Sequence, residues 1–256
     1  MLGNEISPET LIEIGASLNS KSKIQTLNII EVPDQTSLDA FREKKPKTKS
    51  LERMVKTLSS RIKLDINFES IATHKLSSTM QALSELTNIE WLILSWNGRA
   101  YNGIFFNNPI GWIVSHINSN FALFKCNGVT RFEKILLSIR HNSKDADKLI
   151  ETTNSLCKYY NAEFTLLHVV EENIETKKLE IIRNSAQQKL KNTRGNLLLI
   201  SSENPIETVS EMTAEHDLLI LGTPKKDTWV SVLFGTGKDK FAINSTCSVL
   251  RITIKD

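Results

Sequence analysis

The chain has 256 residues, of which 40% are hydrophobic and 24% charged, as expected of a globular protein with room for two small domains. Its 32 basic and 29 acidic residues nearly balance, which gives no support for nucleic-acid binding, and no apolar run approaches the ~20 residues that span a bilayer. Cys126, Cys157 and Cys247 lie far apart without metal-ligand spacing, which predicts free thiols in a cytoplasmic protein.

The first part of the chain alternates helical and strand patterns. Apolar periodicity predicts helices over residues 8–18, 50–61 and 77–86, and strands over residues 24–32, 66–72, 91–96 and 121–125. The basic run at residues 42–49 (REKKPKTK) is expected to be a solvated loop, with contact to an acidic surface or anionic lipid headgroups as the alternative. Asn127-Gly128, directly after a strand, marks the boundary between the first and second parts of the chain.

The second part follows the same alternation. Strands are predicted over residues 134–140, 163–170, 196–201, 218–222 and 248–254, and helices over residues 145–161, 176–192, 205–215 and, after a long loop, 238–244. Strands that alternate with helices predict a parallel sheet covered on both faces. The expected fold is therefore α/β, with two tandem doubly wound domains at residues 1–127 (the first half) and 128–256 (the second half).

The two halves are related by an internal repeat. Residues 11–18 (LIEIGASL) and 149–156 (LIETTNSL) are identical at five of eight positions, and both precede a predicted strand. Residues 91–95 (WLILS) match residues 217–221 (DLLIL), and an Ile-Asn-Ser triplet at Ile117 recurs at Ile243 with the same offset. Three matches in the same order indicate duplication of one ancestral unit.

The repeat also exposes a difference at the amino terminus. In the second half the apolar run 134–140 (KILLSIR) precedes the first helix, but its counterpart should lie just before Gly3, where only Met1 and Leu2 stand. The first strand of such a sheet is typically internal, so its absence should leave neighbouring strands uncovered. The chain is a piece of a longer protein, its start is misassigned, or the strand was lost; we favour the first explanation.

The segment after the strand at 218–222 is a candidate phosphate-binding loop, because ligands of open parallel sheets bind beyond the carboxyl ends of the strands. A Gly-Thr-Pro-Lys turn begins it, and a Gly-Thr-Gly turn ends it before a helix. Backbone N–H groups at such a turn can bind a phosphate, although a tight turn without a ligand explains the pattern equally well. The candidate ligand residues are Gly222, Thr223, Lys225, Gly235, Thr236, Gly237 and Arg140.

This glycine spacing resembles the phosphate-binding signature of the universal stress protein family. Residues 166–170 (LLHVV), 218–221 and 247–252 (CSVLRI) are also similar to strands of that family. The resemblance covers nearly all of the second half and, through the repeat, the first half more weakly. It implies a doubly wound α/β fold, a homodimer and, as in some members, bound ATP or AMP.

Several residues depart from the family pattern. Lys225 stands where the signature has a second glycine, and Arg140 lies at or next to the position where nucleotide-binding members carry an acidic residue. Gly235 and Thr236 do match, whereas Trp96 replaces the first glycine in the first half. These departures argue against a nucleotide cofactor, although the two cations could favour another anion.

A tandem pair whose first unit begins in mid-strand is also similar to the cytosolic C-terminal region of prokaryotic cation-chloride cotransporters and related amino acid permeases. Residues 3–8 (GNEISP) resemble the start of those regions. This resemblance implies a non-catalytic regulatory and dimerisation module at the inner face of the cell membrane, whose partner is the membrane part of a transporter. The alternative is a free-standing tandem universal stress protein that binds ATP or AMP in its second half.

No pattern predicts an enzyme or a metal site. The five histidines lack metal-ligand spacing, and neither a GxSxG elbow nor a Walker A sequence occurs. His168 lies within a predicted strand and is expected to be a satisfied core histidine. Glu171-Glu172 at a strand end are expected to be solvated, and the tryptophans to serve core or interface packing. The tryptophans are Trp91, Trp96, Trp112 and Trp229.

Overall fold

Strands and helices alternate along both halves of the chain. The first half contains α1 (Pro8–Leu18), β1 (Ile24–Glu31), α2 (Pro46–Ile62), β2 (Ile66–Thr73), β3 (Trp91–Ser95) and β4 (Asn120–Lys125). The second half contains β5 (Lys134–Ser138), α5 (Ala146–Tyr160), β6 (Glu163–Val170), α6 (Thr176–Leu190), β7 (Gly195–Ser201), α7 (Pro205–Met212), β8 (Leu218–Gly222), α9 (Lys240–Asn244) and β9 (Ser248–Thr253). The computed structural model describes residues 8–18, 23–35, 37–38, 46–75, 78–79, 82, 89–95, 119–140, 143–222 and 240–255.

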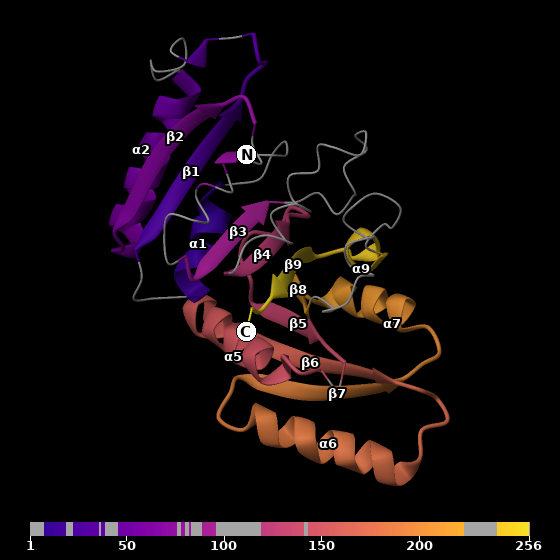
Figure 1. Ribbon diagram of the computed structural model, residues 1–256. Helices are drawn as coiled ribbons and strands as arrows, with labels where there is room; N and C mark the ends of the chain where they lie inside the picture. Colours follow the sequence, from indigo (N-terminus) through magenta and orange to yellow (C-terminus); the bar gives the residue numbers. More distant parts are fainter. Residues whose placement is uncertain are drawn as a thin grey trace.

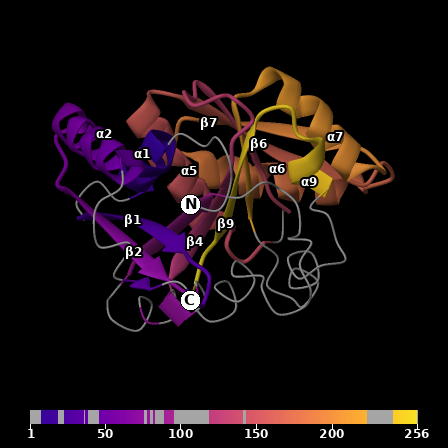
Figure 2. The same ribbon diagram turned by 90° about the horizontal axis from the view of Figure 1, so that it is seen from above.

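A seven-stranded sheet forms the centre of the protein, and a two-stranded sheet lies to one side of it (Figures 1 and 2). The strand order of the larger sheet is β3-β4-β9-β8-β5-β6-β7, and every neighbouring pair is parallel except β4 and β9. The smaller sheet consists of β1 and β2 in parallel. The sequence-based expectation of an α/β fold with a mostly parallel sheet is confirmed.

The antiparallel pair β4–β9 joins the two halves. Phe124 lies opposite Leu250, and the next residue, Lys125, lies opposite Val249. Phe124 and Leu250 are 126 residues apart, which is the offset of the repeat proposed from the sequence, so this pair joins positions that the repeat would make equivalent. Backbone hydrogen bonds therefore run continuously from one half into the other.

The larger sheet is covered on both faces. One hydrophobic cluster packs α1, α5 and α6 against one face, and a second cluster packs α7 and α9 against the other. The central strands have almost no exposed surface, because Leu136 and Leu219 face the second cluster while Leu137 and Ile220 face the first. Continuous apolar runs in these strands reflect burial on both faces, as in other parallel sheets.

Most predicted elements agree with the structure within a few residues, with three differences. Helix α2 begins at Pro46 rather than residue 50, so the last four residues of the basic run are helical and not loop. Proline has no backbone N–H, and it fits the first turn of a helix because N–H groups there have no partner within the helix. Strand β5 ends at Ser138, before a turn in which the amide of Ser143 donates to the carbonyl of Arg140. Helix α7 ends at Met212 and tightens into a 3-10 turn.

The first half lacks a counterpart of β5 among the residues described. In the second half β5 lies between β8 and β6 and pairs with both in parallel. The repeat makes β3 and β1 the counterparts of β8 and β6, yet these two strands belong to different sheets. Strand β3 is mostly half-buried, whereas β8 is mostly buried. The expectation of a missing first strand concerns residues outside the described part and stays a prediction. The helix expected at residues 77–86 lies largely outside the described part.

Candidate functional site

The carboxyl ends of β5, β6 and β8 form the edge where a ligand of this type of sheet would bind. Ser138 of β5 is level with a residue of β6 and a residue of β8, so the positions that follow come together at one edge. His168 and Gly222 lie toward the ends of β6 and β8, and Arg140 follows the end of β5, which lies between these two strands. Neighbouring strands in such sheets are ~4.8 Å apart. The side chain of Arg140 is exposed. Two of the sequence-predicted site residues, Arg140 and Gly222, are thus placed at the same edge.

The other predicted ligands fall in parts of the chain that the structure leaves out. Thr223, Lys225, Gly235, Thr236 and Gly237 lie outside the described residues. The phosphate-binding loop therefore stays a prediction from sequence.

His168 is a core residue, as its position in a predicted strand suggested. Only 5% of its surface is exposed, and Nδ1 lies 2.8 Å from the carbonyl oxygen of Ile139. A carbonyl can only accept, so Nδ1 carries the proton and the ring orientation is fixed by β5. His168 thus ties β6 to the turn after β5.

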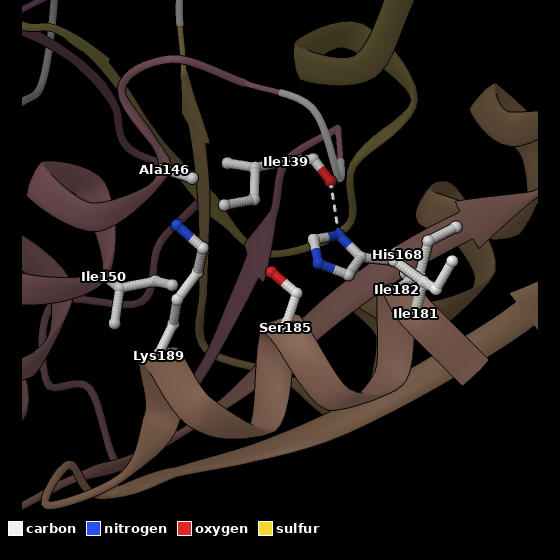
Figure 3. A pocket seen from close by; sticks show the side chains of 8 residues that line it. All are labelled: Ile139, Ala146, Ile150, His168, Ile181, Ile182, Ser185 and Lys189. Atoms are coloured by element: carbon white, nitrogen blue, oxygen red, sulfur yellow. Dashed lines mark hydrogen bonds between the residues drawn. The ribbon is translucent and has the colours of Figure 1, made fainter. Parts of the chain in front are cut away.

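A pocket of about 130 Å³ lies beside His168, between α5, α6 and the sheet (Figure 3). Ser185 and Lys189 of α6 line it together with the apolar side chains of Ile139 and Ile150. The ammonium group of Lys189 pairs with the carboxylate of Asp147 on α5, so its charge is already compensated. Pockets for small-molecule ligands usually measure about 300–1,000 Å³, so this one is too small for a nucleotide.

The glycine at position 222 has a packing explanation that does not involve a ligand. A Cβ atom there would lie 2.7 Å from Cδ1 of Leu149, which is 1% exposed in the core beneath α5. The backbone of Gly222 is not in the left-handed region, so its conformation does not demand glycine. The approach of Leu149 on α5 to β8 therefore accounts for a glycine at this position without a ligand.

Arg251 is a residue of this edge that the sequence analysis missed. It lies on β9 with 6% of its surface exposed, and its Nη1 donates to the carbonyl of Gly222 at 3.0 Å. A charged side chain within the otherwise apolar strand run CSVLRI was the signal that could have identified it, because buried arginines are rare. Its guanidinium group lies beside Gly222, the first residue of the predicted loop.

The repeat places a second cation at the matching position of the first half. Lys125 corresponds to Arg251 at the offset of 126 residues, and both lie on the same face of the β4–β9 pair. The ammonium group of Lys125 donates to the carbonyl of Ala242 on α9 of the second half. Lys125 therefore also stabilises the seam between the halves, whereas the contact of Arg251 lies within the second half.

Other candidate sites have structural explanations in the part of the chain described. His74 and His216 each hydrogen-bond a backbone carbonyl, and Glu171 and Glu172 are exposed, as expected. Trp91 is half-buried against the main core, which confirms the packing expected of it. Among these residues no cluster of histidine, cysteine or carboxylate side chains could hold a metal ion, and no helix is long and apolar enough to cross a membrane.

The three cysteines are free thiols, as predicted. Burial raises the pKa of the Cys157 thiol from 9.0 to about 12 and that of the Cys247 thiol from 9.0 to about 11. Loss of water around a thiolate disfavours the charged form, so neither buried group is a ready nucleophile.

Comparison with known proteins identifies the fold. No family model and no curated protein matches the chain. A universal stress protein from Archaeoglobus fulgidus DSM 4304 matches 97% of this chain over 91% of its own length, with 14% sequence identity and a TM-score of 0.67. The cytoplasmic domain of a prokaryotic cation chloride cotransporter matches 94% of this chain over 88% of its own length, with 13% identity and a TM-score of 0.60.

A third structure, a putative universal stress protein from Pseudomonas aeruginosa UCBPP-PA14, matches 90% of this chain over 92% of its own length, with 8% identity and a TM-score of 0.55. At such low identities these likenesses establish the fold alone. The chain has a universal-stress-protein-like fold, and it is also similar in fold to a transporter's cytoplasmic domain, as the resemblances in sequence implied.

Proposed function

We propose that this universal-stress-protein-like protein is a non-catalytic regulatory and dimerisation module linked to a membrane transporter of the cation-chloride cotransporter or amino acid permease type. The observation that carries the proposal is the likeness in fold, along most of both chains, to a cytoplasmic domain of such a transporter. The module would lie at the cytoplasmic face of the membrane, with the membrane part of the transporter and a second copy of itself as partners.

The chemistry of the second half supports a role without catalysis. The resemblance implies an acidic residue at or next to the position of Arg140, and the pocket beside His168, of about 130 Å³, is smaller than a nucleotide requires. The buried His168 and Arg251 each hold a backbone carbonyl in place. In the described part of this edge, His168 and Arg251 therefore serve the structure rather than a reaction.

Fractionation of cells that carry the gene tests the link to a transporter. An antibody raised against the second half should detect a membrane-bound species larger than a 256-residue chain, resistant to a high-salt wash and released by detergent. A species of 256 residues found only in the soluble fraction would overturn the link. Sedimentation of the purified chain over a range of concentrations tests the homodimer, and a constant monomer mass would contradict that part.

A free-standing tandem universal stress protein that binds ATP or AMP is the second candidate. It is favoured by Gly222 at the carboxyl end of β8 and by the cationic Arg251 beside it. Calorimetric titration with millimolar ATP and AMP separates the two candidates. The first candidate requires no heat of binding, whereas the second requires heat that Thr236→Ala removes.

A matched pair of variants at position 140 tests why the site would not bind a nucleotide. Arg140→Asp restores a carboxylate at the exposed position after β5, where nucleotide-binding relatives of the fold carry an acid, and Arg140→Gln only removes the charge. If the arginine is what prevents binding, Asp should give measurable affinity for AMP and Gln should not. Equal behaviour of both variants would show that other departures, such as Lys225, are responsible.

A further inference from the structure

Helix α2 carries a concentration of positive charge on its solvent side. It lies at one end of the molecule, beside the two-stranded sheet (Figures 1 and 2), and its buried residues Val55 and Leu58 face the small core beneath it. Nine of its residues are exposed, and of these five are basic and none is acidic. They are Pro46, Lys47, Lys49, Ser50, Arg53, Lys56, Thr57, Ser60 and Arg61. The whole chain nearly balances 32 basic against 29 acidic residues, so the cationic character is local to this surface.

Three of these cations form a line along the helix. Lys49, Arg53 and Lys56 are four and three residues apart, which places them on one face over a length of about 10 Å. In the part of the chain described, neither Lys49 nor Arg53 takes part in an ion pair. Lys56 pairs with Glu52 at 3.5 Å but keeps 75% of its side chain exposed, and such a surface pair is weak. The line is therefore available to an external anion.

The fifth exposed cation of α2 is used within the protein. Arg61 lies 2.9 Å from a carboxylate oxygen of Glu13 and 3.6 Å from one of Glu9, both on α1, so its charge is compensated. Four cations remain, and they are called here the α2 cations. They are Lys47, Lys49, Arg53 and Lys56.

The placement of two of the α2 cations is unfavourable for the helix itself. Lys47 and Lys49 lie in its first turn, beside the positive end of the helix dipole, where acidic residues are stabilising. Helices α1, α5 and α7 each have an acidic residue in the first turn, and α6, which has none, directly follows Glu175. A negatively charged surface in contact with α2 would offset this repulsion, so the charge distribution favours an anionic partner.

We propose that the α2 cations bind an anionic lipid surface through the phosphates of its headgroups. The centre of an interface with another protein is enriched in aromatic residues and methionine, and none of the nine exposed residues of α2 is of these types. Binding of single-stranded nucleic acid uses aromatic side chains for base stacking as well. An anionic lipid surface requires only exposed charge, because each lysine or arginine close to it is attracted by the surface potential. This inference goes beyond the transporter link and applies to the chain whether or not a transporter is attached.

Sedimentation of the full chain with lipid vesicles tests the proposal. Vesicles of phosphatidylcholine alone are compared with vesicles that contain about one third phosphatidylglycerol, at low and at physiological ionic strength. We expect binding to the anionic vesicles alone, and weaker binding as salt is added, because salt screens exposed charges. No binding to anionic vesicles at low ionic strength, or equal binding to both kinds of vesicle, would overturn the proposal.

A matched pair of variants locates the binding surface. One variant replaces the α2 cations by glutamine, which is also a good helix former. The control replaces three lysines and one arginine that are exposed on α5 and α6, so the net charge falls from +3 by the same four charges in both variants. The control residues are Lys148, Lys177, Lys178 and Arg183.

The two variants should differ strongly in vesicle binding. Each cation near the surface contributes roughly a fivefold gain in affinity, so the α2 variant should bind at least ~100-fold more weakly and the control within ~5-fold of the original. An equal loss in both variants would overturn the assignment to α2. If circular dichroism shows that the fourfold α2 variant does not fold, Lys49→Gln and Arg53→Gln serve singly, each with a loss of roughly fivefold expected.

Other polyanions provide the last comparison. The full chain is tested with duplex DNA and with polyglutamate at the same low ionic strength. Binding to either polymer without binding to anionic vesicles would show that the α2 cations serve another class of macromolecule, and it would overturn the proposal.

Discussion

Replacement of Gly222 by alanine distinguishes a packing role of this glycine from a ligand-binding role. The new Cβ atom would lie 2.7 Å from Cδ1 and 4.0 Å from Cγ of Leu149, and 4.0 Å from Cγ2 of Ile139. Leu149 is 1% exposed within the main core, so its side chain has no free space into which to rotate. The contact is relieved by a strained rotamer of Leu149 within the packed core or by a shift of α5 relative to β8.

Such overpacking in a buried region costs about 1–3 kcal/mol of the free energy of unfolding. Leu149→Val removes the offending atom and by itself should cost about 0.5–1.5 kcal/mol, as for other losses of one buried methylene. Because Leu149→Val removes the clash, the double variant should be more stable than the sum of the single effects predicts, by about 1 kcal/mol.

Urea unfolding followed by circular dichroism measures the free energy of unfolding of the unsubstituted protein, the two single variants and the double variant. Gly15→Ala is the matched control, because the same substitution within α1 meets Ile93 only at an ordinary contact distance of 3.4 Å and should stabilise the helix by up to about 1 kcal/mol. The packing explanation is wrong if Gly222→Ala changes the free energy of unfolding by less than about 0.5 kcal/mol, or if the effects of Gly222→Ala and Leu149→Val are additive. Either result would favour a ligand-binding role for this glycine.

Three further predictions concern the seam, the thiols and alkaline pH. Asn127 donates through Nδ2 to the carbonyls of Ser245 (3.0 Å) and Cys247 (2.8 Å), so Asn127→Ala should lower the free energy of unfolding by about 1–3 kcal/mol in urea; a loss below about 0.3 kcal/mol would refute this role. At pH 8 a thiol reagent should label the half-buried Cys126 well before the two buried cysteines, and Cys126→Ser should abolish the fast phase; rapid labelling of all three in the folded protein would contradict the burial described. The folded-state pKa of Cys157 is raised by burial, so its contribution to stability is full below about pH 9 and is lost as pH rises toward about 12, because the unfolded chain loses the thiol proton first. Cys157→Ala should therefore flatten the fall in stability measured between pH 9 and 12, and an unchanged pH profile would count against this linkage.

Local pattern predicted the type and order of the elements well. Residues 163–170 and 218–222 were predicted as strands with the bounds that β6 and β8 have, because both faces of a parallel strand are buried and the apolar run is continuous. The errors lie at the ends of helices and strands, where single capping contacts determine which residue is the last. Helix α2 includes Pro46 and the charged turn after it, since exposed lysines are compatible with a helix as well as with a loop.

The candidate site could be predicted only in part. The glycine pattern pointed to the carboxyl edge of the sheet, where Gly222 ends β8 and Arg140 follows the neighbouring β5, and ligand binding there stays a prediction. It could not identify Arg251, because this residue is 29 positions from Gly222 and its role depends on strand pairing. It also could not separate a glycine required by a ligand from one required by Leu149 on a helix 73 positions away.

The sequence by itself determined the α/β class and the order of most helices and strands, because hydrophobic periodicity is a local property of the chain. Only the tertiary structure decided how the strands are distributed between sheets. The first half divides into a separate β1–β2 sheet and a β3–β4 pair that joins the second half through β9. Strand partners and pocket dimensions depend on packing between residues distant in sequence, and no local pattern encodes them.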